Sequence, residues 1–424
     1  MAWVDRIETA IYLALLGWPR LRRGAALGWQ AAWSIGRSLE PEAAGPLKVF
    51  PACFFGFHDK SPWSPSGDYL TVHFVNRAKQ LLQVGVIEPG NDRAIPLATT
   101  SAWNWQQGAQ LQWMSENQFV FNDYDRGGAP VVAAACLNGG TWTVSSGHLS
   151  ALHRKTGVAA FSDYGRIDPL LKGYGYGRRS MQGAERALGK CSDSAFSVKN
   201  VDVGTEIKGF SFDEIRAAAR PLEHSAVDRE AVSHFQFSPE GDLLAFFYLC
   251  KESRARTREI SLMLLDISDG VLTRVPVQYP SHYCWGPDNR LFVTHLSATR
   301  RWCCSLLGLS LGAPAWDIDL PHGDGHVSYC SASNNLLVDT YPDRRRVQRL
   351  MAIDAESREA TNLFAARIPL RFSGVRRCDF HPRWDETGAR VCFDSAHTGE
   401  RSLCVLDLPV GALEAACKSA GPAR

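Results

Sequence analysis

Four histidines stand immediately before the same kind of turn, and this placement has the clearest chemical meaning in the chain. They are His234, His282, His326 and His381. Each precedes a tight turn resembling W-S-P-x-G, and a short hydrophobic strand follows the turn. If copies of a repeat surround a common axis, equivalent side chains converge on it, and converging imidazole nitrogens bind divalent transition metals. The pattern predicts a metal site; the alternative is that each histidine only caps its own turn by hydrogen bonding.

Two aspartates recur beside these histidines. Asp324 lies in the sequence DGDGH and Asp379 lies in CDFH. A carboxylate in this position can ligate the metal directly, or it can accept a hydrogen bond from a ligating imidazole and fix its tautomer. We expect the second role, or a plain role in the turn, rather than direct ligation.

A second group of polar and aromatic residues could carry out proton transfer. It comprises His58 and Lys60 in FGFHDKSPW, Asn122 and Arg126 in FNDYDR, and Tyr174, Tyr176, Arg178 and Arg179 in KGYGYGRRS. Phenols beside guanidinium groups can neutralise a carboxylate and move a proton, which elimination from a uronic acid requires. The same groups can also bind acidic sugars without reacting, because aromatic rings stack on pyranoses and arginine binds carboxylates.

These groups can be assigned roles in an elimination. His58 is the candidate base, Tyr174 or Tyr176 the candidate acid, and Arg178 or Arg179 the group that neutralises the carboxylate. We expect the remaining polar residues to bind substrate. They are Lys60, Asn122, Arg126 and Arg179.

The elements that must position these residues form a repeat. Strong copies of the turn and strand begin at Trp63, Phe237, Trp285, Tyr329 and Trp384, and weaker copies begin at Gln112 and Val144. Their spacing of roughly 45 to 55 residues is the length of one four-stranded propeller blade. The sequence therefore predicts an all-β fold, a seven-bladed β-propeller over residues 47–410.

The segments outside the repeat have a different composition. Residues 1–46 carry apolar positions at helical spacing with arginine clusters between them, which predicts a helical extension. It either packs on the propeller rim or docks on a membrane surface or a partner protein. Its apolar run is too short to span a bilayer and does not resemble a signal peptide, so we expect a cytoplasmic protein. Residues 411–424 are expected to be a frayed tail.

One long interruption separates the third and fourth copies of the repeat. It runs roughly from Tyr164 to Glu223 and includes a helical pattern at SFDEIRAAARPL. Loops at one end of a propeller surround its central channel, so we expect this excursion to build a functional rim.

Composition excludes some classes of function. The 424 residues are 45% hydrophobic and 21% charged, and 46 basic residues against 44 acidic ones leave a formal charge of +2. This balance indicates no general affinity for nucleic acid or membranes. The 12 cysteines are irregularly spaced in strand-like contexts, which is typical of reduced, buried thiols.

Several motifs together resemble a known family. FGFHDKSPW, SHYCW, DGHVSY with DTYPDR, and RCDFHPRW with CFDSAHTGER are similar to motifs of seven-bladed propellers related to ulvan lyases and, more remotely, oligogalacturonate lyases. The resemblance extends from about Phe54 to Leu408. It implies a metal bound by histidines of successive blades, here His234, His282, His326 and His381, with zinc expected and manganese or calcium as alternatives.

The resemblance also implies a reaction, with two departures from the family pattern. Lyases of this kind use histidine and tyrosine for proton transfer and arginine for the uronate carboxylate. Here His58 stands where many relatives carry tyrosine, and Asn122 stands where a catalytic histidine would be expected. We therefore keep two expectations. One is a lyase acting by β-elimination on a uronic-acid-containing polysaccharide or oligosaccharide, and the other is a noncatalytic polysaccharide-binding or scaffold propeller.

Overall fold

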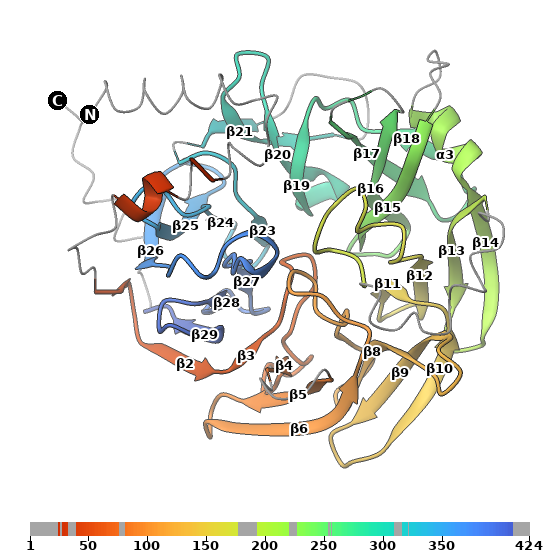
Figure 1. The fold of residues 1–424 in the computed structure, drawn as a ribbon, viewed down its shortest axis with the longest axis horizontal. Coiled ribbons are helices and arrows are strands. Elements are labelled where there is room, and N and C mark those ends of the chain that lie inside the picture. Colours follow the sequence, from red (N-terminus) through yellow and green to blue (C-terminus); the bar gives the residue numbers. More distant parts are fainter. Residues whose placement is uncertain are drawn as a thin grey trace.

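Seven antiparallel sheets surround a central axis in the computed structural model (Figure 1). The structure describes residues 24–25, 28–32, 40–75, 81–176, 193–219, 227–252, 255, 257–308, 316–320 and 322–409. Each sheet is one blade, with its innermost strand at the axis. The predicted all-β, seven-bladed propeller is confirmed.

The first four blades follow chain order. Blade 1 contains β3 (Cys53–Phe54), β4 (Leu70–Phe74), β5 (Leu82–Glu88) and β6 (Arg93–Thr100). Blade 2 contains β7 (Gln112–Trp113), β8 (Gln118–Tyr124), β9 (Pro130–Cys136) and β10 (Thr141–Ser146). Blade 3 contains β11 (Leu149–His153), β12 (Val158–Ser162), β13 (Ser194–Asn200) and β14 (Thr205–Ser211). Blade 4 contains β15 (Val227–Phe237), β16 (Leu243–Glu252), β17 (Glu259–Asp266) and β18 (Leu272–Arg274).

The last three blades complete the ring. Blade 5 contains β19 (Pro280–Trp285), β20 (Leu291–Leu296), β21 (Trp302–Leu307) and β22 (Trp316–Asp319). Blade 6 contains β23 (Val327–Cys330), β24 (Asn335–Asp339), β25 (Val347–Asp354) and β26 (Ala360–Arg367), with β1 (Glu42–Ala43) as a fifth, outer strand. Blade 7 contains β27 (Arg383–Trp384), β28 (Arg390–Ser395), β29 (Ser402–Asp407) and, from the other end of the chain, β2 (Leu47–Pro51).

The two ends of the propeller segment pair to close the ring. Strand β2 lies antiparallel to β29, with Leu47 opposite Leu406 and Pro51 opposite Ser402. Blade 7 therefore takes its outermost strand from the beginning of the chain. This pairing covers the outer edge of β29 and gives blade 7 its fourth strand.

The recurring turn has a common local cause. In three blades the second residue of the turn accepts a hydrogen bond from the backbone N–H five residues later: Ser64 from Tyr69, Ser238 from Leu243, and Asp385 from Arg390. The glycine of each of these turns has a positive φ, between 73° and 79°. The polar side chain and the left-handed glycine reverse the chain between the first and second strands of a blade.

The long interruption is shorter than the sequence predicts. Residues 194–211 form β13 and β14 of blade 3, so the excursion lies between β12 and β13, and residues 177–192 of it are outside the described part. The predicted helix is present as α3 (Phe212–Ala219). Ser211 Oγ accepts from the N–H of Glu214, whose carboxylate accepts from Ser211 N–H, and this reciprocal capping box starts the helix.

The N-terminal extension is described only in part. Residues 24–25 and 28–32 are helical, and the expected tail 411–424 lies outside the described residues. Gln30 Nε2 donates to the carbonyl oxygens of Pro342, at 3.3 Å, and Asp343, at 3.2 Å. The described part of the extension therefore contacts the connection between β24 and β25.

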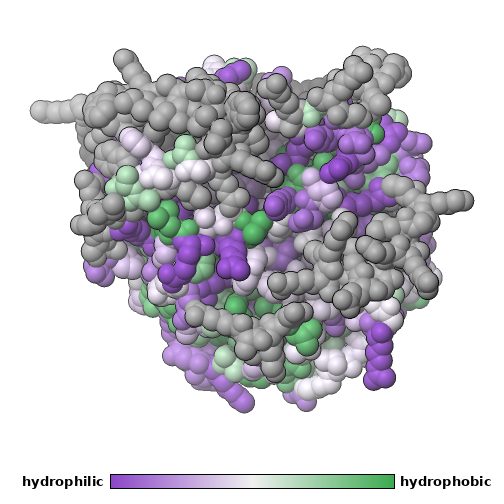
Figure 2. Space-filling view, in the orientation of Figure 1, coloured by the Kyte–Doolittle hydropathy of each residue, from purple (hydrophilic) through white to green (hydrophobic). Residues whose placement is uncertain are grey.

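Three further observations concern the cysteines, the helices and the surface of the described residues. The ten cysteines among the described residues are free, and all except Cys136 are buried. Within the described residues there is no helix with the length and apolar character needed to cross a membrane. On the face seen in Figure 2, hydrophilic side chains gather over the region where Figure 1 shows β16–β18.

Candidate metal centre

Five histidines from five blades are buried near the axis. They are His58 between β3 and β4, His234 on β15, His282 on β19, His326 just before β23 and His381 just before β27. Their exposed fractions lie between 0% and 7%. The structure thus adds His58, which the sequence suggested as a base, to the four histidines suggested as metal ligands.

Four of these imidazoles are in direct contact. The ring centroids of His282 and His326 lie 4.0 Å apart, and those of His326 and His381 lie 4.3 Å apart. His58 is 5.2 Å from His326. His326 is therefore the common neighbour of the other three rings.

His234 joins the group through an aromatic ring. The Phe57 ring centroid lies 4.7 Å from that of His234 and 4.8 Å from that of His381. Phe57 also contacts the other three imidazoles. Phe57 is thus an apolar neighbour shared by all five imidazoles.

Irregular backbone directs two of the histidines inward. His234 has φ of 60° and His381 has φ of 46°, both in the left-handed region that such residues rarely adopt. The pairing register also shifts on β15 between Ser233 and Gln236 and on β19 between Pro280 and His282. Bulges of this kind re-aim side chains and are common beside functional sites.

The strongest indication of a ligand is the set of buried ring nitrogens that have no hydrogen-bond partner. The set comprises both nitrogens of His58 and of His381, Nδ1 of His234 and of His282, and Nε2 of His326. Each unsatisfied buried group costs about 1 to 3 kcal/mol, so such groups are rare and call for an explanation. Two of these residues, His326 and His381, have ligand atoms within 4.8 Å of one another and of Asp379, a spacing that fits a divalent cation.

Asp339 holds two of the histidines in place. One carboxylate oxygen accepts from the backbone N–H and Nδ1–H of His326, at 2.7 and 2.9 Å, and the other accepts from the backbone N–H of His381 at 3.0 Å. In the neutral His326 ring, Nδ1–H donates to Asp339 and Nε2 carries the free lone pair. A carboxylate behind a histidine commonly orients metal ligands in this way.

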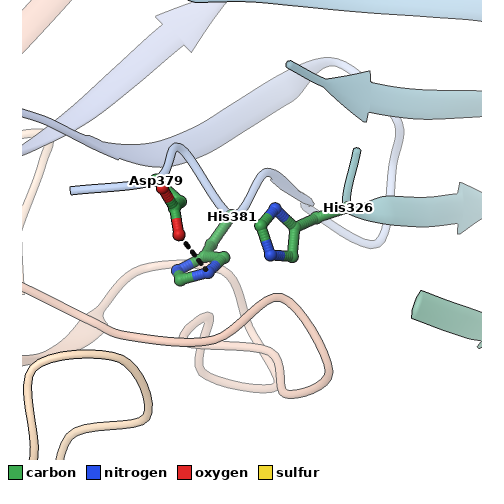
Figure 3. A group of neighbouring side chains, drawn as sticks. All are labelled: His326, Asp379 and His381. Carbon is green, nitrogen blue, oxygen red and sulfur yellow. Dashed lines mark ion pairs between the residues drawn. The ribbon is translucent and has the colours of Figure 1, made fainter. Parts of the chain in front are cut away.

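Asp379 and Asp324 each lie near one of the imidazoles. Asp379 Oδ2 is 3.9 Å from His381 Nε2, and Asp324 Oδ2 is 3.7 Å from His282 Nε2. Figure 3 shows Asp379 beside His381, with the His326 ring facing the same space. Ligand atoms of His326, Asp379 and His381 all lie within 4.8 Å of one another. Asp379 is therefore close enough to ligate a metal directly, although the sequence favoured an indirect role for it.

The histidines are mostly in the form that binds metals. Burial, followed by the neighbouring imidazole of His326, lowers the pKa of His58, His282 and His381 well below the usual value. Burial, followed by the charge of Lys60, lowers the pKa of His234 to about 3. These four imidazoles are therefore expected to be neutral at neutral pH. Burial also acts to lower the pKa of His326, but the Asp339 carboxylate outweighs it and the pKa is raised.

A tyrosine and an arginine adjoin the histidines at one end of the channel. The Tyr174 ring centroid is 5.2 Å from that of His234, and its hydroxyl accepts from Arg377 Nη2 at 2.6 Å. Arg377 is also paired with Asp379. The hydroxyl of Tyr341 lies 3.3 Å from His282 Nε2. All three residues come from connections at the end of the blades opposite the recurring turns.

Tyr174 is protonated and Arg377 is charged at neutral pH, as a proton donor beside a fixed positive charge must be. Burial raises the pKa of Tyr174, and Arg377 offsets part of this effect. Burial acts to lower the pKa of Arg377, but Asp379 outweighs it, so the guanidinium stays charged. Tyr174 therefore carries its proton at neutral pH.

Tyr176 and Asn122 are placed together, apart from the histidines. The Tyr176 hydroxyl accepts from Asn122 Nδ2 at 2.8 Å, and its ring stacks on Tyr164 at 4.3 Å. Asn122 also donates to Leu149 O and accepts from Leu149 N–H, which ties blade 2 to blade 3. These contacts are structural.

The structure does not bring the other suggested substrate-binding residues to Tyr174. Lys60 Nζ donates to Asp59 Oδ2 at 2.6 Å and to Phe235 O at 2.7 Å. It lines a cavity of about 290 Å³ bounded by the recurring turns, at the opposite end of the channel. Arg126 is exposed on the loop after β8. Arg178 and Arg179 lie outside the described residues.

Three residues of the centre carry no role predicted from the sequence: Asp339, Tyr341 and Arg377. All three stand in the quoted motifs DTYPDR and RCDFHPRW. A repeated pattern could have pointed to Asp339. In two other blades, an Asp or Asn near the end of the second strand accepts a hydrogen bond from the backbone at the first strand of the next blade. Asn122 accepts from Leu149 N–H, and Asp394 accepts from the N–H groups of Phe55 and Gly56.

Substituting Asp339 by Asn is expected to weaken metal binding by about 10 to 100-fold, because the amide cannot accept from both His326 and His381. Titration of metal-free protein with zinc or manganese measures the change. Asp385→Asn is the control, since this buried carboxylate accepts from Ala389 and Arg390 in a turn away from the histidines. Equal metal affinity in both variants would contradict the role given to Asp339.

Comparison with known proteins supports the fold. No family model and no curated protein sequence matches this chain. Among solved structures, an oligogalacturonate lyase from Vibrio parahaemolyticus matches with a TM-score of 0.57 at 11% identity, covering 89% of this chain and 95% of that chain. An oligogalacturonate lyase in complex with manganese matches with a TM-score of 0.39 at 10% identity, covering 90% and 96%. The first likeness agrees with the remote resemblance to oligogalacturonate lyases at the level of the fold.

Proposed function

We propose that this protein is a metal-dependent polysaccharide lyase that cleaves a uronic-acid-containing polysaccharide by β-elimination. One observation carries the proposal. Buried imidazoles with unpaired nitrogens converge on the channel beside a tyrosine and a charged arginine. A cation bound there, Tyr174 as proton donor and the fixed charge of Arg377 would together meet the needs of this reaction.

The metal would be held by His326, Asp379 and His381, whose ligand atoms lie within 4.8 Å of one another, with His282 as a further nitrogen donor. A nitrogen-rich donor set of this kind favours zinc or manganese over calcium, which prefers oxygen ligands. A bound divalent cation would draw charge from the uronate carboxylate and so make the C5 proton more acidic.

The chain's own side chains supply the remaining requirements. Arg377 can hold the uronate carboxylate through its guanidinium. His58 is neutral and can take the proton from C5. As the C5–H bond breaks, a double bond forms between C4 and C5 and the C4–O4 bond breaks. Tyr174 can give its proton to the departing O4.

A noncatalytic role has an observation in its favour. Tyr174 is 3% exposed and His381 is fully buried, so the described residues enclose the centre. A metal at this point could serve only to join the inner strands of several blades, as structural zinc sites do. The propeller would then bind polysaccharide on its surface without cleaving it.

Incubation with a panel of acidic polysaccharides tests the proposal. Metal-loaded protein is expected to generate ultraviolet absorbance from the unsaturated uronate product on at least one polymer, such as polygalacturonate, alginate or glucuronan. The metal-free protein is the control and should give no product. Saturable binding without product would favour the noncatalytic role, and neither binding nor product would overturn both.

A further inference from the structure

The end of the ring that carries Tyr174 and Arg377 also carries cations that the histidine centre does not use. Lys172 lies in the connection between β12 and β13, Arg258 just before β17, and Arg376 in the connection between β26 and β27. All three residues are exposed. Within the described part of the chain none of them forms an ion pair with a carboxylate. Their charges are therefore available to a ligand.

Lys172 and Arg376 lie on two segments that touch each other. A Cβ on Gly173 would lie 3.3 Å from the Cβ of Val375, so the segments are in contact at the residues beside these cations. Tyr174, next on the first segment, accepts a hydrogen bond at 2.6 Å from the arginine that follows Arg376. Both cations therefore lie at the edge of the candidate site.

Arg258 approaches the same place from blade 4. Ile260, which follows it on β17, packs against the apolar cluster that contains Tyr174. Partial burial lowers the pKa of Arg258, Tyr174 acts to raise it, and the like charge of Arg377 acts to lower it. The guanidinium stays charged at neutral pH. Two neighbouring positive charges of this kind favour a bound anion.

Acidic side chains close to these cations in the sequence are already engaged. Asp163 pairs with Arg166 at 3.8 Å, and Asp379 pairs with Arg377. Asp168 Oδ1 accepts from a backbone N–H at 2.8 Å. These carboxylates therefore leave the charge of the exposed cations uncompensated.

The other end of the ring is more acidic. Its recurring turns carry four exposed carboxylates, those of Asp68, Glu116, Glu240 and Asp288. Among these four, only Asp288 forms an ion pair within the described residues, with Arg290 at 3.1 Å. A negatively charged polymer is therefore repelled at this end and attracted to the opposite one.

We propose that the end of the ring carrying Tyr174 is the docking face for an acidic polysaccharide. Lys172, Arg258 and Arg376 bind the carboxylates of sugar units on either side of the unit at the histidine centre. The choice of polysaccharide as the polyanion rests on the function proposed above. Because these are surface ion pairs, each contributes modestly and salt weakens all of them.

Binding of polygalacturonate, alginate and glucuronan to the full-length protein at low ionic strength tests the inference, with calorimetry as the measurement. At least one of these polymers is expected to bind. The triple variant Lys172→Gln, Arg258→Gln, Arg376→Gln should weaken that binding about 10-fold or more, because each lost surface ion pair costs about 2- to 5-fold. Added salt should shrink the difference.

A charge-matched variant provides the control. The triple variant Arg154→Gln, Lys155→Gln, Arg358→Gln removes as much charge from exposed residues at the acidic end and should bind as the wild type. The inference is overturned if none of the three polymers binds or if both triple variants weaken binding equally. It is also overturned if single-stranded DNA binds as tightly as each acidic polysaccharide.

This inference and the proposed lyase activity can fail separately. Cleavage with an unchanged KM in the Lys172, Arg258 and Arg376 variant would keep the lyase and remove the docking face. Binding that depends on these three cations, without any product, would keep the docking face and remove the lyase.

Discussion

Replacing His381 by Ala is expected to remove tight metal binding and, with it, lyase turnover. Both ring nitrogens of His381 are buried without a partner, and its ring contacts His326 and Phe57. Loss of one ligand should lower metal affinity by more than about 100-fold, the upper range seen for residues behind the ligands. Elemental analysis of untagged wild-type protein should find about one equivalent, and the variant far less.

Thermal unfolding adds a second measurement. A cation present at 100 times its dissociation constant stabilises the folded state by about 2.7 kcal/mol. Chelation should therefore lower the melting temperature of the wild type and leave that of His381→Ala almost unchanged. Wild-type protein without metal, and indifferent to chelators, would instead favour histidines that only cap their turns.

His73 provides a matched control for burial. This histidine is also fully buried, but its Nδ1 contacts Phe54 O at 3.2 Å and its Nε2 accepts from Ala109 N–H at 2.9 Å. Its nitrogens are satisfied within the protein, so His73→Ala should lower stability while keeping the metal. Equal metal loss in both variants would mean that unfolding, rather than a missing ligand, explains the result.

Tyr174→Phe is expected to reduce turnover by about 100-fold or more, with little change in KM, because only the proposed proton donor is lost. The ring remains beside His234, so the centre should keep its metal. Initial rates on the polymer cleaved by the wild type measure the effect. Wild-type rates in Tyr174→Phe would remove this residue from the mechanism.

Tyr176→Phe is the matched control two residues away. It loses the hydrogen bond from Asn122 and keeps the stack on Tyr164. We expect turnover near that of the wild type and a loss of about 1 kcal/mol in the free energy of unfolding. A large fall in turnover for Tyr176→Phe alone would contradict the assignment of the donor to Tyr174.

The fold was predictable from the sequence because its repeating turn is encoded locally. Ser64, Ser238 and Asp385 each bond a backbone group five residues later, so the signal lies within a short window. The repeat is harder to recognise in blade 3, because a long excursion separates β12 from β13. The pairing of these two strands therefore leaves no pattern within a short stretch of sequence.

The candidate site was predictable only where it follows the repeat. The histidines could be found because they hold a common position relative to the turns. Tyr174 and Tyr176 could not be separated by spacing, because their environments depend on how the segment between them packs. A Cβ on Gly175 would lie 2.6 Å from Tyr164 O, so the chain there is pressed against the preceding turn. Arg377 and Tyr341 lie in connections between strands, and only tertiary packing brings them to the centre. Their positions therefore could not be predicted from the repeat.

The closure of the ring by β2 and β29 has a consequence for the order of folding. Strand β2 is synthesised before blades 1 to 6, yet its partner β29 is the last strand of the propeller. Pairing between distant chain segments is slow because loop closure precedes the gain from contacts. His381, which precedes blade 7, reaches His326 only as this last blade docks. Until β2 pairs with β29, the outer edge of β29 is exposed and can pair with another chain. We therefore expect the proposed cation to bind only after blade 7 has packed in place.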